Sequence, residues 1–428
     1  MAPPQASAPF SFYAPRTGSH PSKSRFVFAS GIECSYPVIE TPAGRVRRDQ
    51  MAECGHYDRW REDLDLALAL GCRHLRYGPP LYRIHEGPGR YDWSFTDEVM
   101  PAMRELGITP IVDLCHFGVP DWIGDFQNAD WPVYFAEYAR TFAARYPWIR
   151  LYTPVNEMYI TAEFSGYYGW WNERLASHRG FVGALRTVVL ASLAAMQAIL
   201  EVRPDALFIH AESSEHTHAN RPELTHEAEM FNERRFLTLD LICGHRLSAG
   251  MYAYLRDNGM SEAEYARLRS VDLTEHFIVG HDYYVTNEHL LVAPEVRRAS
   301  GEVFGYDTVA RAYHDRYRLP VMHTETNLAQ GPRGDEASNW LWKTWANVQQ
   351  LRRDGVPICG MTWYSLIDQI DWDVGLREKN DRVNPLGLYD LERRLRPAGD
   401  AFRRLITQWS DTPLLPYGPF SIVGGLDG

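Results

Sequence analysis

Two glutamates stand where apolar stretches of the chain end, and their positions favour a catalytic role. Glu157 follows the stretch IRLYTPVN, and Glu325 follows LPVMHT. A charged side chain at the end of a buried strand costs free energy unless it is paired. Two carboxyls that face each other can cleave a glycosidic bond. One is protonated and releases the leaving oxygen, while the other is ionised and attacks the anomeric carbon or directs water at it.

Neighbouring residues allow these two roles to be assigned. Asn156 precedes Glu157, and its amide could hold a sugar 2-hydroxyl. Arg76 and a tyrosine hydroxyl are expected beside Glu325, and a positive neighbour within about 4–6 Å lowers a carboxyl pKa by roughly 1–3 units. We therefore predict that Glu325 is the nucleophile and Glu157 the acid/base. A carboxyl separation of about 5–5.5 Å would give retention, and roughly 6.5–9.5 Å inversion.

The elements that must position these residues are apolar runs that alternate with segments of helical periodicity. Eight runs are predicted to be strands: 26–33, 74–79, 108–117, 149–157, 206–213, 276–284, 320–327 and 360–368. Helices are predicted between them, including 58–71, 131–146, 183–202 and 339–355. Gly71 and Gly107 follow two of these helices, as a glycine that ends a helix does.

Eight strands with helices between them predict a single (β/α)8 TIM barrel with elaborated βα loops. Each run turns polar at its end, and in such a barrel all strand ends meet on one face. The polar ends are Glu33, Arg76, His116, Asn156–Glu157, Glu212, Asp282–Tyr284, Glu325 and Asp368. A doubly wound open sheet is the competing architecture. It is disfavoured because no GxGxxG follows the first strand and no GxxxxGK[ST] occurs.

The chain is predicted to have one catalytic domain, residues 26–428, behind a flexible arm. The arm, residues 1–25, is rich in proline and serine and has no apolar region typical of a secretory signal. None of the six cysteines forms a CxxC pair, which predicts reduced thiols in a cytoplasmic protein.

The overall charge of the chain limits the classes of molecule that it is expected to bind. A net charge of −11 argues against non-specific binding to nucleic acid or to an anionic membrane. No uninterrupted apolar run is long enough to predict a membrane span. Aromatic residues make up 13% of the chain and could stack on the apolar faces of sugar rings. The sequence leaves open whether the protein is a monomer or a homo-oligomer.

Several motifs resemble glycoside hydrolase family 1, the retaining β-glycosidases on a (β/α)8 barrel. TPVNEMY is similar to the T-F/L-N-E-P stretch of that family, and LPVMHTETN to P-x-x-I-T-E-N-G. The resemblance implies that Glu157 is the acid/base and Glu325 the nucleophile. It runs from about residue 26 to residue 408.

Four further stretches carry the resemblance to the sugar-binding residues. RYGPPLYRI, LCHFGVPDW and GHDYYVT are similar to R-F-S-I-S-W-P-R-I, L-x-H-W-D-L-P and G-x-N-Y-Y-T. GMTWYSLIDQIDWDVGL is similar to G-Y-x-x-W-S-L-x-D-N-F-E-W-x-x-G-Y. The substrate-binding residues that these stretches imply are Arg76, His116, Tyr284, Trp363, Asp371 and Trp372.

The chain departs from the family pattern at residues that would contact sugar hydroxyls. The first-strand glutamine of the family has no clear match, and Glu33, Ser35 or Tyr36 could replace it. Asp282 stands for an asparagine, and Asp371 for a glutamate that is one methylene longer. These changes predict the same chemistry on a different glycone. The branch that binds 6-phosphorylated sugars is a poor match, because Asp373 would repel a phosphate.

Other patterns allow both a structural and a functional interpretation. His216 and His218 could bind zinc, but a lone pair favours a polar loop. His323 could orient Glu325 or fill the barrel. Trp170 and Trp171 could form part of an aglycone site or pack inside a loop.

The whole pattern predicts a retaining β-glycosidase that acts on an unphosphorylated, small or hydrophobic glycoside and needs no cofactor. Two alternatives remain. One is a transglycosidase that uses the same site, and the other is a catalytically silent barrel that binds sugar.

Overall fold

Eight parallel strands close into one barrel in the computed structural model, which describes residues 25–415. In chain order they are β1 Val27–Gly31, β4 His74–Tyr77, β7 Thr109–Asp113, β8 Leu151–Thr153, β9 Leu207–Ser213, β11 Phe277–Asp282, β14 Val321–Glu325 and β15 Ile358–Trp363. The order around the barrel is β1-β15-β14-β11-β9-β8-β7-β4. The predicted (β/α)8 barrel is therefore confirmed. Apart from Arg25, the predicted N-terminal arm lies outside the described residues.

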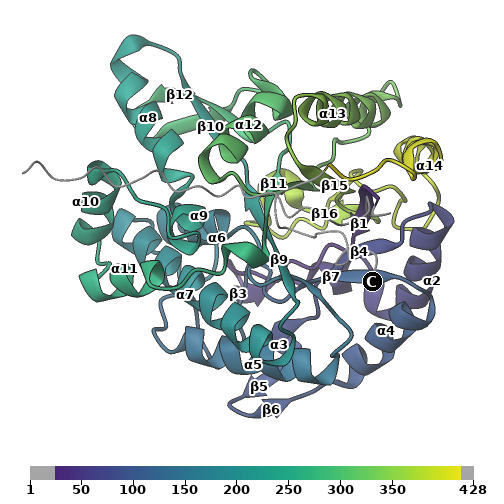
Figure 1. The fold of residues 1–428 in the computed structure, drawn as a ribbon, viewed down its shortest axis with the longest axis horizontal. Helices are drawn as coiled ribbons and strands as arrows, with labels where there is room; N and C mark the ends of the chain where they lie inside the picture. Colours follow the sequence, from purple (N-terminus) through teal and green to yellow (C-terminus); the bar gives the residue numbers. More distant parts are fainter. Residues whose placement is uncertain (1–24, 416–428) are drawn as a thin grey trace, which may run out of the picture.

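A ring of helices covers the outside of the barrel (Figure 1). Its members are α2 His56–Ala69, α4 Ser94–Glu105, α5 Trp131–Arg145, α7 His178–Val202, α9 Leu237–Ile242, α12 Gly305–Tyr317, α13 Glu336–Arg353 and α14 Pro397–Trp409. Gly71 and Gly107 follow α2 and α4 with φ of +87° and +68°. Both lie in the left-handed region that glycine adopts at low cost, so these helices end as predicted.

Helix α7 is long and apolar enough, by length and composition alone, to cross a membrane. Its apolar surface is not free, however, because 78% of the most apolar stretch is buried inside the protein. The helix packs against α5 and α6 Met158–Ala162, as expected of a core helix of the barrel.

The interior of the barrel is apolar at one end and polar at the other. Alternate strand residues fill the apolar end: Val27, Ala29, Ile111, Leu151, Leu207, Ile209, Ile278, Met322 and Cys359. Nearer the carboxyl ends of their strands, Arg76, Asp113 and Asp282 are buried as well. Because side chains alternate along a strand, Asp113 continues the row of Ile111, and Asp282 that of Ile278. The polar end is the face on which barrel sites form.

Several strands end earlier than the apolar runs suggest. The run 149–157 was predicted as a strand, but β8 ends at Thr153. Pro154 follows and has no N–H to continue the ladder. Similarly, β7 ends at Asp113, and Phe117 adopts a φ of +66°. The residues past these ends form loops at the barrel mouth.

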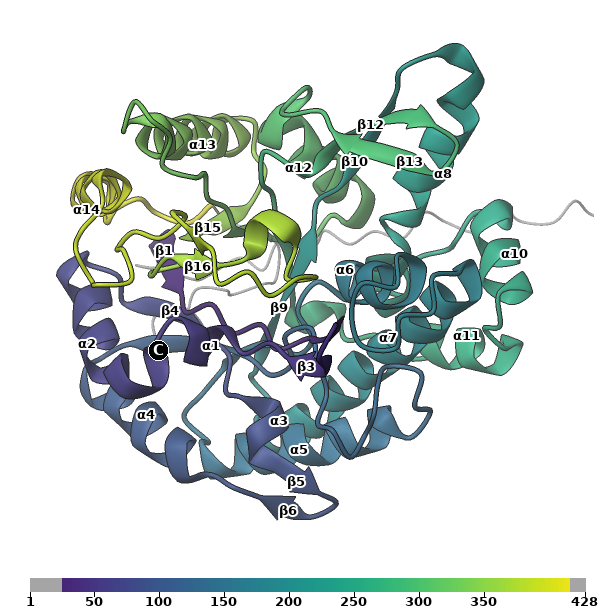
Figure 2. The same cartoon turned by 180° about the vertical axis from the view of Figure 1, so that it is seen from behind.

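The loops carry short elements of their own. These are β2 Val38–Thr41, β3 Gly44–Arg47, α1 Gln50–Glu53, α3 Leu81–Ile84, β5 His85–Gly87, β6 Arg90–Tyr91, α8 Thr225–Arg234, α10 Ala249–Asp257, α11 Glu262–Arg269, β16 Gln369–Ile370 and β17 Val383–Asn384. A π-helical turn, Glu163–Tyr167, follows α6. A separate three-stranded sheet of β10 His216–Ala219, β12 Glu288–Ala293 and β13 Val296–Ala299 projects from the barrel beside α8 (Figure 2).

Candidate active site

A cavity of about 690 Å³ opens at the carboxyl ends of the strands, and both glutamates line it. Of the predicted site residues, those that line this cavity are Glu33, His116, Glu157, Tyr284, Glu325 and Trp372. Arg76 and Asn156 are buried in contact with these residues, while Trp363 and Asp371 point elsewhere. The cavity therefore brings together most of the predicted site.

A β-bulge aims Glu325 at the cavity. His281 of β11 pairs with His323 of β14, but the next pair is Asp282 with Glu325. Thr324 is thus an extra residue on β14, and such a bulge turns the following side chain. As a result Glu325 and His323 do not share a face. The His323 ring stacks on Tyr306 of α12 with centroids 3.9 Å apart, so it packs against the helix layer.

Two groups bind the carboxylate of Glu325. Arg76 forms an ion pair with Oε1, and the Tyr284 hydroxyl donates to Oε2 at 2.6 Å. The Arg76 guanidinium also donates to Asp113 Oδ2 at 2.9 Å and to Asn156 Oδ1. Glu325 and Arg76 are both buried, so each charge compensates the other. The carboxylate of Glu325 is therefore held between a positive charge and a hydroxyl.

Glu157 occupies a strained position directly before α6. Its φ and ψ are 37° and 63°, which is uncommon for a residue with a side chain. The Glu157 N–H donates to the Ala211 carbonyl at 2.9 Å, and the Glu157 carbonyl accepts from the Thr161 N–H at 2.8 Å. Such a conformation costs about 1–3 kcal/mol and persists where the surroundings impose it.

The environment of Glu157 favours its protonated form. Burial raises the pKa of its carboxyl well above the ordinary value, and the nearby carboxyls of Asp282, Glu325 and Glu212 raise this pKa further. A general acid at neutral pH must hold its proton, so this shift fits the acid/base role.

His116, Asn156 and Asp113 are joined by hydrogen bonds below the cavity. The His116 Nδ1 contacts Asp113 Oδ2 at 2.7 Å, and its Nε2 contacts Asn156 Nδ2 at 2.9 Å. Asp113 also binds Arg76 and thus connects the histidine with the partner of Glu325. Asp113 was not predicted, although it is a charged residue within the apolar run 108–117.

Glu33 is the first-strand candidate that reaches the cavity. Ser35 and Tyr36 are buried outside its lining. Glu33 Oε1 accepts from the Ser35 N–H at 2.9 Å, and Glu33 Oε2 accepts from Gln369 Nε2 at 3.3 Å. Burial raises the pKa of Glu33, while His116 opposes that rise. Gln369 also lines the cavity and was not predicted.

Asp282 is a second carboxyl beside Glu325. It is fully buried on β11, and neither carboxyl oxygen has a hydrogen-bond partner among the described residues. Burial and the charge of Glu325 raise its pKa well above the ordinary value, although Arg76 opposes this. From the sequence, Asp282 was expected at a polar strand end and as a replacement for an asparagine, but not as a buried carboxyl beside Glu325.

Trp363 and Asp371 were expected to bind sugar, but neither lines the cavity. The Trp363 ring is buried, and its N–H donates to the Leu386 carbonyl at 3.0 Å. The next residue, Tyr364, stacks on His116 and lies 5.3 Å from the Arg76 guanidinium. The carboxylate of Asp371 is directed into its own loop.

The outer part of the cavity is mainly apolar. Trp170 lines it, whereas Trp171 is buried and packs on Phe117 with centroids 4.8 Å apart. Of the two tryptophans, only Trp170 is placed to contact an aglycone. On the same wall Arg297 of β13 forms an ion pair with Glu163 at 2.7 Å and binds the Tyr168 hydroxyl at 2.7 Å.

The described residues contain one group with metal-ligand spacing, Cys34, Asp113 and His116. Asp113 already pairs with Arg76, whose positive charge opposes a cation there. The histidines considered for zinc are bound to other groups: His218 contacts Glu288 at 2.7 Å, and His216 contacts Arg235 at 3.1 Å. Asp113, His216 and His218 therefore already have protein partners.

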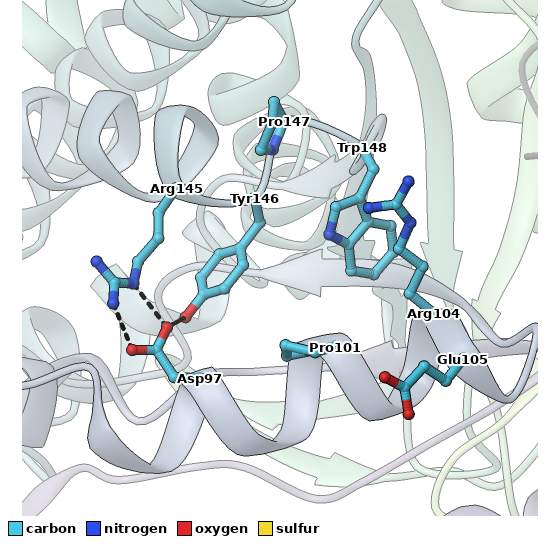
Figure 3. Close-up of a pocket in the computed structure, with 8 residues that line it drawn as sticks. All are labelled: Asp97, Pro101, Arg104, Glu105, Arg145, Tyr146, Pro147 and Trp148. Atoms are coloured by element: carbon cyan, nitrogen blue, oxygen red, sulfur yellow. Dashed lines mark hydrogen bonds and ion pairs between the residues drawn. The ribbon is translucent and has the colours of Figure 1, made fainter.

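A second hollow of about 820 Å³ lies on the outer surface at α4 and the end of α5 (Figure 3). Several of its groups contact each other: Arg145 and the Tyr146 hydroxyl both bind Asp97, and Arg104 lies over the Trp148 ring. α4 and α5 lead into the starts of β7 and β8, so this hollow is remote from the catalytic face.

Comparison with known protein families agrees with this geometry. The model of the family described as Glycosyl hydrolase family 1 matches residues 39–288, more than half of the chain. The chain belongs to glycosyl hydrolase family 1. The matched segment contains Arg76, His116 and Glu157, while Glu325 lies beyond it.

Relatives of this family 1 chain are distant. It is 28% identical to Beta-glucosidase A of Thermotoga maritima over 150 residues, which span 33% of each protein. It is 25% identical to Phospho-cellobiase of Klebsiella oxytoca over 361 residues, which cover 73% of this chain and 76% of that one. The structure of the beta-glucosidase from Thermotoga maritima in complex with deoxynojirimycin superposes with a TM-score of 0.74 at 17% identity. This superposition covers 89% of this chain and 97% of the Thermotoga maritima chain.

Proposed function

We propose that this family 1 protein is a retaining β-glycosidase that uses Glu325 as nucleophile and Glu157 as acid/base. The observation that carries the proposal is the contrast between two carboxyls in one cavity. Glu325 has the Arg76 guanidinium and the Tyr284 hydroxyl in contact with its carboxylate. Glu157 is buried among carboxyls, which favour its protonated form. Pairs of carboxyls in such different environments divide the acid and nucleophile roles between them.

The reaction would proceed in two displacements. First, a Glu325 oxygen attacks the anomeric carbon, the glycosidic C–O bond breaks, and the leaving oxygen takes the proton of Glu157. The esterified Glu325 no longer carries a charge, so Glu157 stays ionised more readily. In the second step Glu157 takes a proton from water as the water oxygen attacks the anomeric carbon. The ester bond breaks, and Glu325 regains its carboxylate.

We further propose that the glycoside is unphosphorylated and has an apolar or aromatic aglycone. The supporting residues are Asp373 and Arg382, which both line the cavity and pair at 2.7 Å. The carboxylate of Asp373 occupies the arginine and would repel a phosphate. On the outer wall, the apolar and aromatic residues suited to such an aglycone are Ile160, Phe164, Tyr168, Trp170, Val285 and Leu328. Because a relative is named Phospho-cellobiase, paired phosphorylated and unphosphorylated aryl β-glycosides test this point directly.

The nucleophile is tested by covalent labelling. A 2-deoxy-2-fluoro β-glycoside with a good leaving group should inactivate the enzyme and esterify Glu325, as peptide mass spectrometry can detect. Glu325→Gln serves as the control and should take up no label. Inactivation with the label on another residue would contradict the assignment.

The acid/base is tested by the leaving group. Glu157→Ala should slow poor leaving groups by about 10²–10⁴-fold, the usual contribution of general acid catalysis, and slow activated aryl glycosides far less. Added azide should restore turnover and yield a glycosyl azide of retained configuration. Equal losses on all substrates without azide rescue would rule out this role.

Two alternative functions use the same cavity. A transglycosidase would give products other than free sugar when alcohols or sugars are added as acceptors. A silent sugar-binding barrel would bind glycosides without turnover, but a binder has no need of two carboxyls with opposed environments. The cytoplasmic location predicted from the six thiols stays a prediction.

A further inference from the structure

The loop from Asp371 to Leu386 forms one wall of the active-site cavity. Its residues that line the cavity are Trp372, Asp373, Arg382, Val383, Asn384, Pro385 and Leu386. Within this loop residues 377–383 are exposed, and the short strands β16 and β17 pair at its two ends. Because an exposed segment has few buried contacts, specific hydrogen bonds are needed to hold this wall in one conformation.

The carboxylate of Asp371 supplies these bonds from inside the loop. Its Oδ2 accepts from the N–H groups of Asn380 and Asp381 at 2.9 and 3.0 Å, and its Oδ1 accepts from the Arg382 N–H at 2.8 Å. The backbone N–H of Asp371 in turn donates to the Arg382 carbonyl at 2.9 Å. Three successive amides thus converge on one fully buried carboxylate. The carboxylate of Asp371 is thus bonded within its own loop, and the residue does not line the cavity.

Arg48 ties this arrangement to the first half of the chain. Its guanidinium is fully buried and donates to Asp371 Oδ2 at 3.0 Å, to the Glu378 carbonyl at 2.6 Å and to both oxygens of Glu53. The side-chain oxygen of Gln50, Oε1, also accepts a hydrogen bond from the Ile370 N–H at 3.1 Å. In Figure 2 the yellow-green segment around β16 accordingly lies beside the purple segment around α1 and β3.

We infer that Asp371 is a positioning residue, which holds residues 371–386 in place as a wall of the cavity and does not bind the sugar. The inference rests on the proposed function only insofar as the cavity is a glycoside site. The shorter side chain explains the change of role: it keeps the carboxylate close to the backbone, where three N–H groups and Arg48 bind it. The sugar hydroxyls on this side are left to Gln369, Trp372 and Asp373.

Proteolysis tests the structural half of the inference without any substrate. The loop contains three exposed trypsin sites, Arg377, Lys379 and Arg382. Asp371→Asn replaces an acceptor oxygen by an NH₂ group that faces N–H donors, so cleavage at these three sites should become at least tenfold faster. Asp257→Asn makes the same change on an exposed carboxylate outside the loop, and its cleavage rate at the three sites should equal that of the wild type. Equal rates for Asp371→Asn and wild type would overturn the inference.

A measurement on the unaltered protein covers the case in which Asp371→Asn does not fold. The amides of Asn380, Asp381 and Arg382 should exchange with deuterium slowly, although the surrounding side chains are exposed. The neighbouring amide of Lys379, for which no such bond to Asp371 exists, should exchange faster. Rapid exchange at all four positions would overturn the inference.

Kinetics with deoxy glycosides test whether Asp371 acts on the sugar directly. If Asp371 only positions the loop, Asp371→Asn should raise KM by a similar factor for the parent aryl glycoside and for each monodeoxy analogue, with a smaller change in kcat. If Asp371 binds a sugar hydroxyl directly, the substitution should have little effect on KM for the one analogue that lacks that hydroxyl. That selective loss would overturn the inference. Absence of turnover on every glycoside would instead count against the proposed function and leave the two loop measurements valid.

Discussion

At the scale of single residues, the site depends on three carboxyls that share one buried region. Asp282 and Glu325 raise the pKa of Glu157, and Glu325 raises that of Asp282, while among these three Glu325 is the one with an ion pair to Arg76. The placement of Glu157 and Glu325 in one cavity could be predicted, because each follows an apolar run. The surroundings of Asp282 and Asp113 could not, since they depend on Glu325 and Arg76, which lie far away in sequence.

The raised pKa of Glu157 predicts the alkaline limb of the pH profile. Activity needs protonated Glu157, so it should persist below the pKa of this group in the folded enzyme and fall as the pH rises through it. Asp282→Asn removes a carboxyl that raises the pKa of Glu157. The limb of kcat/KM against pH should therefore move to lower pH.

The control for this shift is Asp257→Asn, an exposed aspartate on α10. It should leave the pH profile unchanged. An alkaline limb that stays in place or moves to higher pH in Asp282→Asn would contradict the assignment of the limb to Glu157.

At the scale of elements, the β-bulge in β14 decides where the nucleophile points. The eight strands and their order along the chain could be predicted, because apolar periodicity is local. The bulge could not, since it appears only when β11 and β14 pair. For the same reason the sequence suggested that His323 and Glu325 share a face, whereas the structure turns them to different layers.

Gly280 makes room for this bulge, which gives a test at the element scale. A Cβ at Gly280 would lie 2.6 Å from Thr324 Oγ1 and 2.7 Å from the His210 carbonyl oxygen. Gly280→Ala should lower the free energy of unfolding by about 1–3 kcal/mol, as overpacking does. A displacement of β14 by about 1 Å would reduce kcat/KM by about 10²-fold.

Urea unfolding and steady-state kinetics measure these two effects. Gly250→Ala, in helix α10, is the control, because its Cβ would meet nothing closer than 3.8 Å. It should not destabilise the protein, since alanine favours a helix more than glycine does. Full activity and stability in Gly280→Ala would show that β14 adjusts without moving Glu325.

At the scale of the whole molecule, a buried ion pair joins the segment before α14 to helix α2 near the start of the barrel. Arg393 precedes α14 and donates to both oxygens of Asp63 on α2 at 2.8 and 3.0 Å. His56 contacts the same carboxylate at 2.8 Å. Arg393 and Asp63 are almost fully buried, so neither charge has water as an alternative partner.

Removing one member of this pair should destabilise the entire barrel. Asp63→Ala leaves the Arg393 guanidinium buried and unpaired, and such a loss costs about 3–5 kcal/mol. Asp65→Ala, at an exposed position on the same helix, should change the free energy of unfolding by less than about 0.5 kcal/mol. Urea unfolding of both variants measures the difference, and equal stability would show that Arg393 finds another partner.

The pairing of β1 with β15 also bears on how the chain is made. β1 is the first barrel strand to be synthesised. One of its two neighbours in the barrel, β15, is synthesised last and begins at Ile358. Until then one edge of β1 has backbone groups without their final partners, and such an edge invites pairing with other chains. Nascent chains that stall before residue 358 should therefore require chaperones to remain in solution. In the complete chain β15 pairs with β1 and covers that edge.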